Sequence, residues 1–225
     1  MIIDERLSVF IDALQWNLPG ELAELEQQAL EDQVPIIRRP MQTFLGFILG
    51  MTQPASILEI GTAVGFSGIL MSEYVPEQTS ITTIEKVPAR IRAAKANFVR
   101  YGKEDRICLL EGDAAEVLEK LCAQGNQYDF IFMDAAKGQY LNFLEPVLEM
   151  LTEDGLLVTD NVLQDGDIIQ SRYAITKRDR TIHGRMREYL YFLTHSERFK
   201  TVVLPVGDGA ALSQVVPVTI RNQKK

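Results

Sequence analysis

ILEIGTAVGFSG, residues 57–68, joins an apolar run to a helix-like run through a short turn that contains two glycines. Gly61 and Gly65 permit a tight turn and a close approach of the backbone to a ligand, because glycine has no Cβ. The helix that follows offers free N–H groups in its first turn. This order predicts the first strand, turn and helix of an α/β sheet.

Strand-like and helix-like segments alternate after this stretch. Apolar runs at 56–60, 80–85, 106–112, 128–134 and 155–160 predict strands, and the segments between them have helical periodicity. Strands that are apolar on both faces and separated by helices indicate a parallel sheet covered by helices. We expect a doubly wound, Rossmann-like α/β fold with right-handed connections.

The two ends of the chain depart from this alternation. Residues 1–52 have helical spacing and predict an N-terminal helical cap. Near the other end, runs at 200–206 and 211–216 are joined by Gly207-Asp208-Gly209, which predicts an antiparallel hairpin. No Pro/Gly-rich linker divides the chain, so we predict a single domain, 1–225, with an α/β core at 53–216 and a tail at 217–225 of no assigned function.

The composition is typical of a soluble globular protein, with 46% hydrophobic residues, 24% charged residues and a net charge of −8. No run approaches the roughly 18 apolar residues that a membrane span requires, and acids replace the basic start of a signal peptide. Cys108 and Cys122 lie in apolar, periodic segments without metal-binding spacing. We therefore predict a cytoplasmic protein, no membrane partner, and two reduced core thiols.

One segment is strongly basic in this acidic chain. Residues 171–187 hold six basic residues and one acid, a local charge of +5, so the rest of the chain carries −13. Such a segment is either a solvated surface or a surface that meets phosphates.

Acidic residues stand at the predicted ends of the first three strands, where open α/β sheets bind ligands. Glu59 suits a cationic group, Glu85 the two hydroxyls of a ribose, and Asp113-Ala114 an adenine amino group. Ala63 replaces the second glycine of the GxGxxG dinucleotide fingerprint, so its methyl group disfavours a pyrophosphate and an NAD-dependent oxidoreductase. The three ends together indicate S-adenosylmethionine (SAM), although Asp113 alone is also a plausible helix cap.

The motifs ILEIGTAVGFS, DAAKGQYLNF, TDNVL and LPVGDGAALS resemble the class I SAM-dependent methyltransferases, and within them the metal-dependent O-methyltransferases of the catechol and caffeoyl-CoA type. As a set they are most similar to the bacterial tRNA 5-hydroxyuridine methyltransferases, over roughly residues 30–215. The resemblance implies a seven-stranded sheet with the last strand antiparallel, and a homodimer that uses the N-terminal helices. It also implies that SAM is bound by Ile37, Glu59, Gly61, Thr62, Ser67, Glu85, Asp113, Ala114 and Asp134.

The fourth and fifth predicted strands end in Asp134 and in Asp160-Asn161. If these strands are neighbours, two carboxylates and one amide form an all-oxygen cluster, which favours Mg²⁺, with Mn²⁺ as the alternative. Zinc would prefer His or Cys, and His183 and His195 are distant in sequence. The competing interpretation is that both aspartates only cap helices.

Lys137 follows the first of these aspartates by three residues. The resemblance assigns it the role of general base, or of the group that orients the acceptor, for displacement at the sulfonium methyl. We expect a divalent cation nearby to lower the lysine pKa and to ease loss of the hydroxyl proton.

The basic segment and the resemblance together predict the acceptor. The prediction is the hydroxyl of 5-hydroxyuridine at the tRNA wobble position, giving 5-methoxyuridine, with the anticodon loop as partner. The alternatives are a small catechol or CoA-linked phenol, an NAD-dependent oxidoreductase, and a non-catalytic binding protein. Gln164, where enzymes for small phenols commonly have an aromatic residue, weakens the first of these. The predicted RNA contacts are Arg38, Arg39, Lys177, Arg178 and Arg180.

Overall fold

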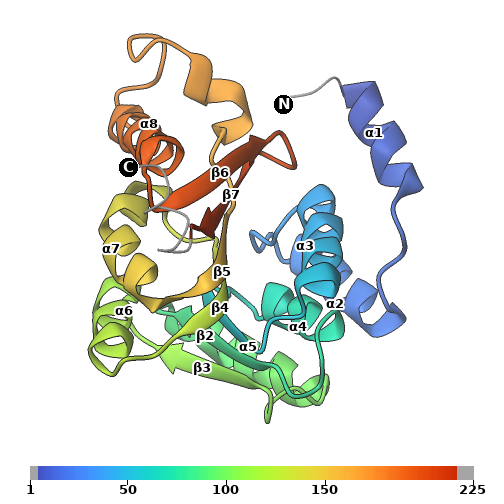
Figure 1. Cartoon of the computed structure of the whole chain (residues 1–225). Coiled ribbons are helices and arrows are strands. Elements are labelled where there is room, and N and C mark those ends of the chain that lie inside the picture. Colours follow the sequence, from blue (N-terminus) through green and yellow to red (C-terminus); the bar gives the residue numbers. More distant parts are fainter. Residues whose placement is uncertain (1–4, 217–225) are drawn as a thin grey trace. The chain divides into compact units, whose positions relative to one another are not determined.

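The computed structural model describes residues 5–216 (Figure 1). The α-helices are α1 (Glu5–Leu14), α2 (Gly20–Glu31), α3 (Arg39–Thr52), α4 (Phe66–Glu73), α5 (Pro88–Arg100), α6 (Ala114–Ala123), α7 (Tyr140–Met150) and α8 (Arg180–His195). Two 3₁₀ segments are η1 (Lys137–Gln139) and η2 (Gln164–Ile169). The strands are β1 (Ser56–Ile60), β2 (Ser80–Glu85), β3 (Ile107–Glu111), β4 (Tyr128–Met133), β5 (Leu151–Thr159), β6 (Phe199–Leu204) and β7 (Ala210–Val215).

The sheet confirms the predicted fold class. Its seven strands have the order β3-β2-β1-β4-β5-β7-β6, and β7 is antiparallel to both of its neighbours. Chain contacts group the described part of the chain into two compact units, residues 5–117 and 118–216. The division into cap, core and tail stays a prediction, and the tail at 217–225 lies outside the described residues.

In the unit of residues 5–117, strands β1, β2 and β3 are parallel and in register, with Ile60 beside Ile84 and Glu85 beside Glu111. Their apolar side chains are largely buried, and α4 packs against α2 and α3. Helices α1, α2 and α3 lie in the N-terminal part whose spacing predicts helices, and Pro40 lies in the first turn of α3, where its fixed φ suits a helix start. This arrangement brings the carboxyl ends of three strands to one edge.

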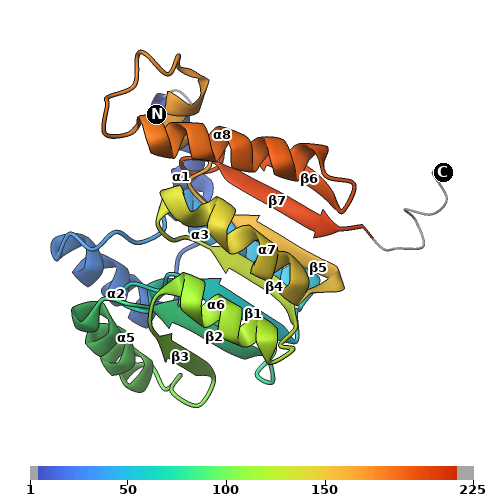
Figure 2. The same ribbon diagram turned by 90° about the vertical axis from the view of Figure 1, so that its left-hand side faces the viewer.

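In the unit of residues 118–216, β4 and β5 are parallel, and the β6–β7 hairpin lies beside β5. Helix α8 packs against α7 and β6, as Figure 2 shows. Tyr140 and Tyr189, both buried, form an edge-to-face pair between α7 and α8. The carboxyl ends of β4 and β5 therefore sit on a densely packed support.

The structure bears on the predictions about membrane spanning and about the two cysteines. No helix within residues 5–216 is long and apolar enough to cross a membrane. Cytoplasmic location stays a prediction. The prediction of core thiols is wrong: Cys108 is exposed and Cys122 half-exposed, and both are free. Cys108 lies on β3, which is an edge strand of the sheet. An apolar run on an edge strand is only partly buried, so its cysteine can be exposed to solvent.

Candidate cofactor and metal sites

The turn after β1 has the backbone geometry that its glycines permit. Gly61 and Gly65 have φ values of 96° and 86°, in the left-handed region. A Cβ on Gly65 would lie 2.6 Å from the Phe98 ring, so no larger residue fits without a shift. Ala63 also has a positive φ, 48°, and its N–H donates to Glu85 Oε2 at 3.1 Å. The turn is thus tied to the end of the neighbouring strand.

Glu59 on β1 is fully buried. Its Oε2 accepts a hydrogen bond from Thr83 at 2.5 Å, whereas its Oε1 has no hydrogen-bond partner within residues 5–216. Burial raises the pKa of Glu59, and the nearby hydroxyls of Ser67 and Thr83 oppose that rise. A buried carboxylate oxygen without a partner is costly, and a cationic ligand group would offset that cost. This fits the predicted contact with the SAM ammonium.

Glu85 is held rigidly at the end of β2. Besides the bond from Ala63, its Oε1 accepts hydrogen bonds from the N–H groups of Lys86 and Val87, at 2.8 and 2.9 Å. The carboxylate orientation is therefore set before any ligand arrives. Thr62 and Ser67 are buried in the same region, and the Ile37 carbonyl accepts a hydrogen bond from Gln42 at 2.9 Å.

Asp113 behaves as the helix cap that the alternative interpretation describes. Its Oδ1 accepts a hydrogen bond from the Ala115 N–H at 3.0 Å, at the start of α6, where Ala114 is the first residue. Lys86 donates to its other oxygen at 3.1 Å, and this hydrogen bond is the main cause of the lowered Asp113 pKa. A role in binding adenine remains a prediction.

The structure brings together the residues of the predicted metal site. Met133 and Thr159 are paired on parallel strands, so Asp134 and Asp160 follow on adjacent strand ends. The Asn161 side-chain amide lies 3.1 Å from Asp134 Oδ1, with its Nδ2 as donor. The Tyr140 hydroxyl donates to the Asp160 carbonyl at 3.2 Å, which fixes the backbone of this loop from α7.

A third carboxylate, which the sequence analysis missed, lies beside Lys137. The Lys137 Nζ lies 3.4 Å from Oδ2 of the buried Asp208. The hairpin that carries Asp208 is bonded to the loop after β5: Leu163 N–H donates to the Asp208 carbonyl at 3.0 Å, and Val162 N–H to the Gly209 carbonyl at 2.9 Å. In the sequence, Gly207-Asp208-Gly209 indicated only a turn.

The cluster has an excess of negative charge. Burial raises the pKa of Asp160 well above its usual range, and the carboxylates of Asp134 and Asp208 raise it further. Two carboxylates and an amide provide the hard oxygen donors that Mg²⁺ prefers, so the residues fit a divalent cation of that kind. Among residues 5–216, no group of three or more His, Cys, Asp or Glu side chains has a metal-binding arrangement. The fit therefore depends on Asn161 as the third donor.

Several predicted RNA contacts already have partners within the protein. Arg39 donates to the Trp16 carbonyl at 2.7 Å and lies 3.7 Å from Glu26. Arg180 donates through Nε to the Ile175 carbonyl at 3.1 Å. Lys177 and Arg178 are exposed in the segment before α8, and Arg38 is exposed at the start of α3. Their roles in binding remain predictions.

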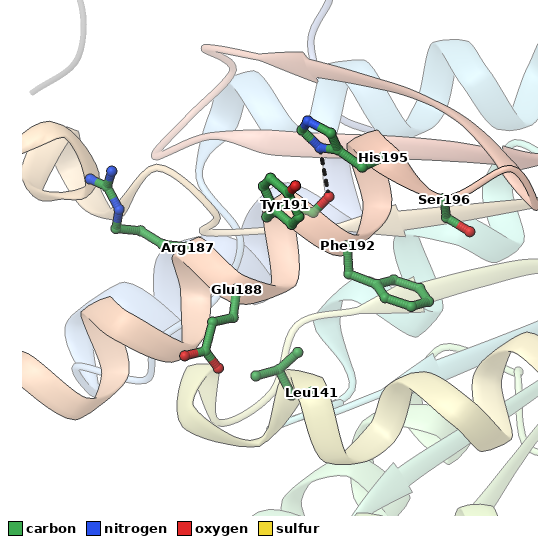
Figure 3. Close-up of a pocket in the computed structure, with 7 residues that line it drawn as sticks. All are labelled: Leu141, Arg187, Glu188, Tyr191, Phe192, His195 and Ser196. Atoms are coloured by element: carbon green, nitrogen blue, oxygen red, sulfur yellow. Dashed lines mark hydrogen bonds between the residues drawn. The ribbon is translucent and has the colours of Figure 1, made fainter.

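A cavity of about 710 Å³ lies on the surface of α7 and α8 (Figure 3). Its lining includes Leu141, Glu188 and Phe192, together with Tyr191, whose ring stacks on that of His195. None of the predicted cofactor or metal residues lines it, so the chemistry is not assigned to this cavity.

The family of this chain follows from its match to a protein-family model. Residues 16–216 match the family model described as O-methyltransferase. The chain belongs to the O-methyltransferase family. It is therefore a SAM-dependent O-methyltransferase. This agrees with the predicted reaction type, whereas the predicted acceptor stays a prediction, and it disagrees with the alternative of an NAD-dependent oxidoreductase.

Individual relatives agree with this family. Caffeoyl-CoA O-methyltransferase from Eucalyptus gunnii is 28% identical over 180 residues, covering 79% of this chain and 72% of that protein. Catechol O-methyltransferase from Niastella koreensis is 32% identical over 127 residues, covering 56% of this chain and 58% of that protein. The family resemblance seen in the motifs is thus confirmed, whereas similarity to tRNA-modifying members stays a prediction.

Solved structures share the fold over nearly the whole chain. A structure from Staphylococcus aureus, whose name suggests a caffeoyl-CoA O-methyltransferase, is 30% identical with a TM-score of 0.85 and covers 94% of this chain and all of its own. An SAH-bound methyltransferase from Podospora anserina is 25% identical with a TM-score of 0.84, covering 96% of this chain and 97% of its own. SAH is the product that SAM leaves after methyl transfer, so this relative supports SAM as the cofactor.

Proposed function

We propose that this O-methyltransferase transfers the SAM methyl group to a hydroxyl of a catechol or a CoA-linked phenol, with Mg²⁺ as cofactor. The observation that carries the proposal is the cluster of Asp134, Asp160, Asn161 and Lys137 beyond the ends of β4 and β5. The caffeoyl-CoA and catechol enzymes among its relatives support this acceptor class.

The chain's residues have separate tasks in this reaction. The sulfonium S–CH₃ bond breaks as the O–CH₃ bond forms, SAH leaves, and the acceptor hydroxyl proton passes to a base. Lys137 is the group positioned to take that proton, and Asp208 holds its Nζ in place. Mg²⁺, held by Asp134, Asp160 and Asn161, would stabilise the negative charge that develops on the acceptor oxygen. Glu59 and Glu85 would hold the cofactor's ammonium and ribose, so that much of the rate comes from alignment.

The test is methyl transfer from labelled SAM to catechol and caffeoyl-CoA, measured with added Mg²⁺, with EDTA, and after Mg²⁺ is restored. We expect turnover that EDTA abolishes and Mg²⁺ restores. Unchanged turnover in EDTA would contradict the assignment of the metal site. No transfer to any catechol or CoA-linked phenol would contradict the acceptor class.

A second acceptor, 5-hydroxyuridine at the tRNA wobble position, is favoured by one observation. Arg172, Lys177 and Arg178 are exposed in the segment that precedes α8, where they can contact phosphates without reading sequence. The measurement is mass spectrometry of nucleosides from tRNA incubated with enzyme, labelled SAM and Mg²⁺. Labelled 5-methoxyuridine would establish this acceptor, and its absence alongside active catechol methylation would exclude it.

We further propose that the protein is a homodimer that buries α1. The apolar residues of this helix are uncovered: Leu7 is 48%, Phe10 61% and Leu14 70% exposed. An apolar helix face of this kind is normally covered by another element or by a second copy. Light scattering coupled to size-exclusion chromatography should give twice the 25.4 kDa chain mass, and the double variant Phe10→Ser, Leu14→Ser should give the monomer mass. A monomeric wild type would contradict the proposal.

A further inference from the structure

We propose that Arg185 is a positioning residue for Lys137, because its hydrogen bond stabilises the backbone turn that carries the lysine. This inference rests on the proposed function, in which Lys137 handles the acceptor proton. Arg185 lies on α8, whereas Lys137 opens η1, 48 residues earlier in the chain.

The contact is short and specific. Arg185 Nη1 donates a hydrogen bond to the Gly138 carbonyl at 2.6 Å, and Gly138 directly follows Lys137. The arginine side chain is half-buried at this point, which limits competition from water. Helix α8 also packs against η1, and a Cβ built on Gly138 would lie 3.6 Å from Ile182.

The turn that carries Lys137 is a single short 3₁₀ segment. Segment η1 is three residues long, and the Gln139 N–H donates a backbone hydrogen bond to the Ala136 carbonyl at 2.7 Å. A 3₁₀ turn of this length has poorer hydrogen-bond geometry than an α-helix. Arginine fixes its acceptor more firmly than a neutral donor does, because charge-assisted hydrogen bonds are the stronger ones.

The Lys137 amino group depends on that backbone for its position. Lys137 reaches Asp208 through a flexible four-carbon side chain, and the Nζ–Oδ2 separation is 3.4 Å. A shift of the turn would move the Nζ from both Asp208 and the acceptor hydroxyl. Misplacement of a catalytic group by about 1 Å can cost about 100-fold in rate.

The same helix provides a matched control. Arg187 Nη1 donates to the Ile168 carbonyl at 2.9 Å and so ties α8 to η2, a segment without Lys137. Both arginines belong to the basic segment 171–187, and both bond to a backbone carbonyl. Arg185→Met and Arg187→Met therefore remove the same type of bond from the same helix, and one of them touches the lysine turn.

The first measurement is hydrogen exchange of the backbone amides at residues 137–140, which does not depend on turnover. We expect faster exchange there in Arg185→Met and wild-type exchange in Arg187→Met. Equal exchange in the two variants would overturn the stabilising role. This result stands even if no acceptor is found for the wild type, an outcome that would count against the proposed function instead.

The second measurement separates kcat from cofactor binding. Arg185→Met should lower kcat by about 10- to 100-fold while the Kd for SAM changes less than about 2-fold, and Arg185→Lys should recover part of the loss. In a Lys137→Ala background, Arg185→Met should lower kcat no further, because it acts through the lysine. Independent, multiplying losses in the double variant, or a kcat loss matched by Arg187→Met, would overturn the proposal.

Discussion

Replacement of Gly209 by alanine tests whether the β6–β7 hairpin positions the metal-site loop. Gly209 has a φ of 100°, and a Cβ built on it would lie 2.6 Å from the Leu163 backbone nitrogen. The Gly209 carbonyl also accepts the Val162 N–H, in the loop that carries Asp160 and Asn161. An added methyl group must therefore push the hairpin and this loop apart.

The cost has two separable parts. Alanine in the left-handed region costs about 1–2 kcal/mol, partly offset by about 0.4–1 kcal/mol from the smaller entropy of the unfolded chain. Overlap with a packed neighbour that cannot move freely adds about 1–3 kcal/mol. Gly207 in the same hairpin has a φ of 60°, and among the described residues no non-adjacent atom lies within 4 Å of a Cβ built on it, so Gly207→Ala carries the first part of the cost alone. We expect a loss of about 1 kcal/mol for Gly207→Ala and about 3 kcal/mol for Gly209→Ala.

Urea unfolding of both variants measures these free energies, and methyl-transfer assays at a temperature where both are folded measure the site. Gly209→Ala should also lose more turnover than Gly207→Ala, because displacement of the hairpin moves Asp208 away from Lys137. Equal stability and equal turnover in the two variants would refute the reasoning, since they would show that the Leu163 contact is not tight.

Three further predictions concern the other residues of the sites. Gly65→Ala, whose Cβ would lie 2.6 Å from Phe98, should lower stability and SAM affinity more than Gly102→Ala. Gly102 also has a positive φ, but among the described residues no non-adjacent atom lies within 4 Å of its Cβ position. Calorimetry with SAM checks the affinities, and equal effects in the two variants would contradict the prediction. Glu59→Gln should weaken SAM binding. Because the Glu59 pKa is raised in the folded state, the carboxyl of the unfolded wild type ionises first as pH rises above 4.5, and the ligand-free wild type loses stability over that range. The glutamine variant does not titrate, so its free energy of unfolding should increase relative to that of the wild type over the same range. Urea titrations from pH 4 to 8 measure the difference, and a constant gap would count against it. Lys137→Ala should retain SAM binding and lose about 10²- to 10⁴-fold in turnover, whereas wild-type turnover would remove the lysine from the mechanism.

Much of the site could be predicted because acids and glycines stand directly at strand ends. Asp134 and Asp160 each follow an apolar run, and parallel neighbours bring such positions together without any further information. Asp208 could not be found in this way, because its partner Lys137 is 71 residues away in the chain. The glycines on either side of Asp208 indicate only a turn.

The roles of the arginines in the basic segment 171–187 also could not be predicted from the sequence. Its local charge is plain in the sequence, but Arg180, Arg185 and Arg187 each bond to a backbone carbonyl of their own chain. Charge density alone does not distinguish an arginine that supports the fold from one that meets a ligand. Arg172, Lys177 and Arg178, which are exposed in that segment, are left as the candidates for phosphate contacts.

The sequence by itself determined the strand-and-helix alternation, the antiparallel hairpin, and the identity of the groups at the strand ends, because these depend on local periodicity and on turn chemistry. The tertiary structure alone decided which distant groups meet: Asp208 with Lys137, and Arg185 with the turn of Gly138. It also decided that one buried oxygen of Glu59 has no hydrogen-bond partner within residues 5–216. Such contacts depend on packing between elements far apart in the chain, and no local pattern of residues encodes a distance between them.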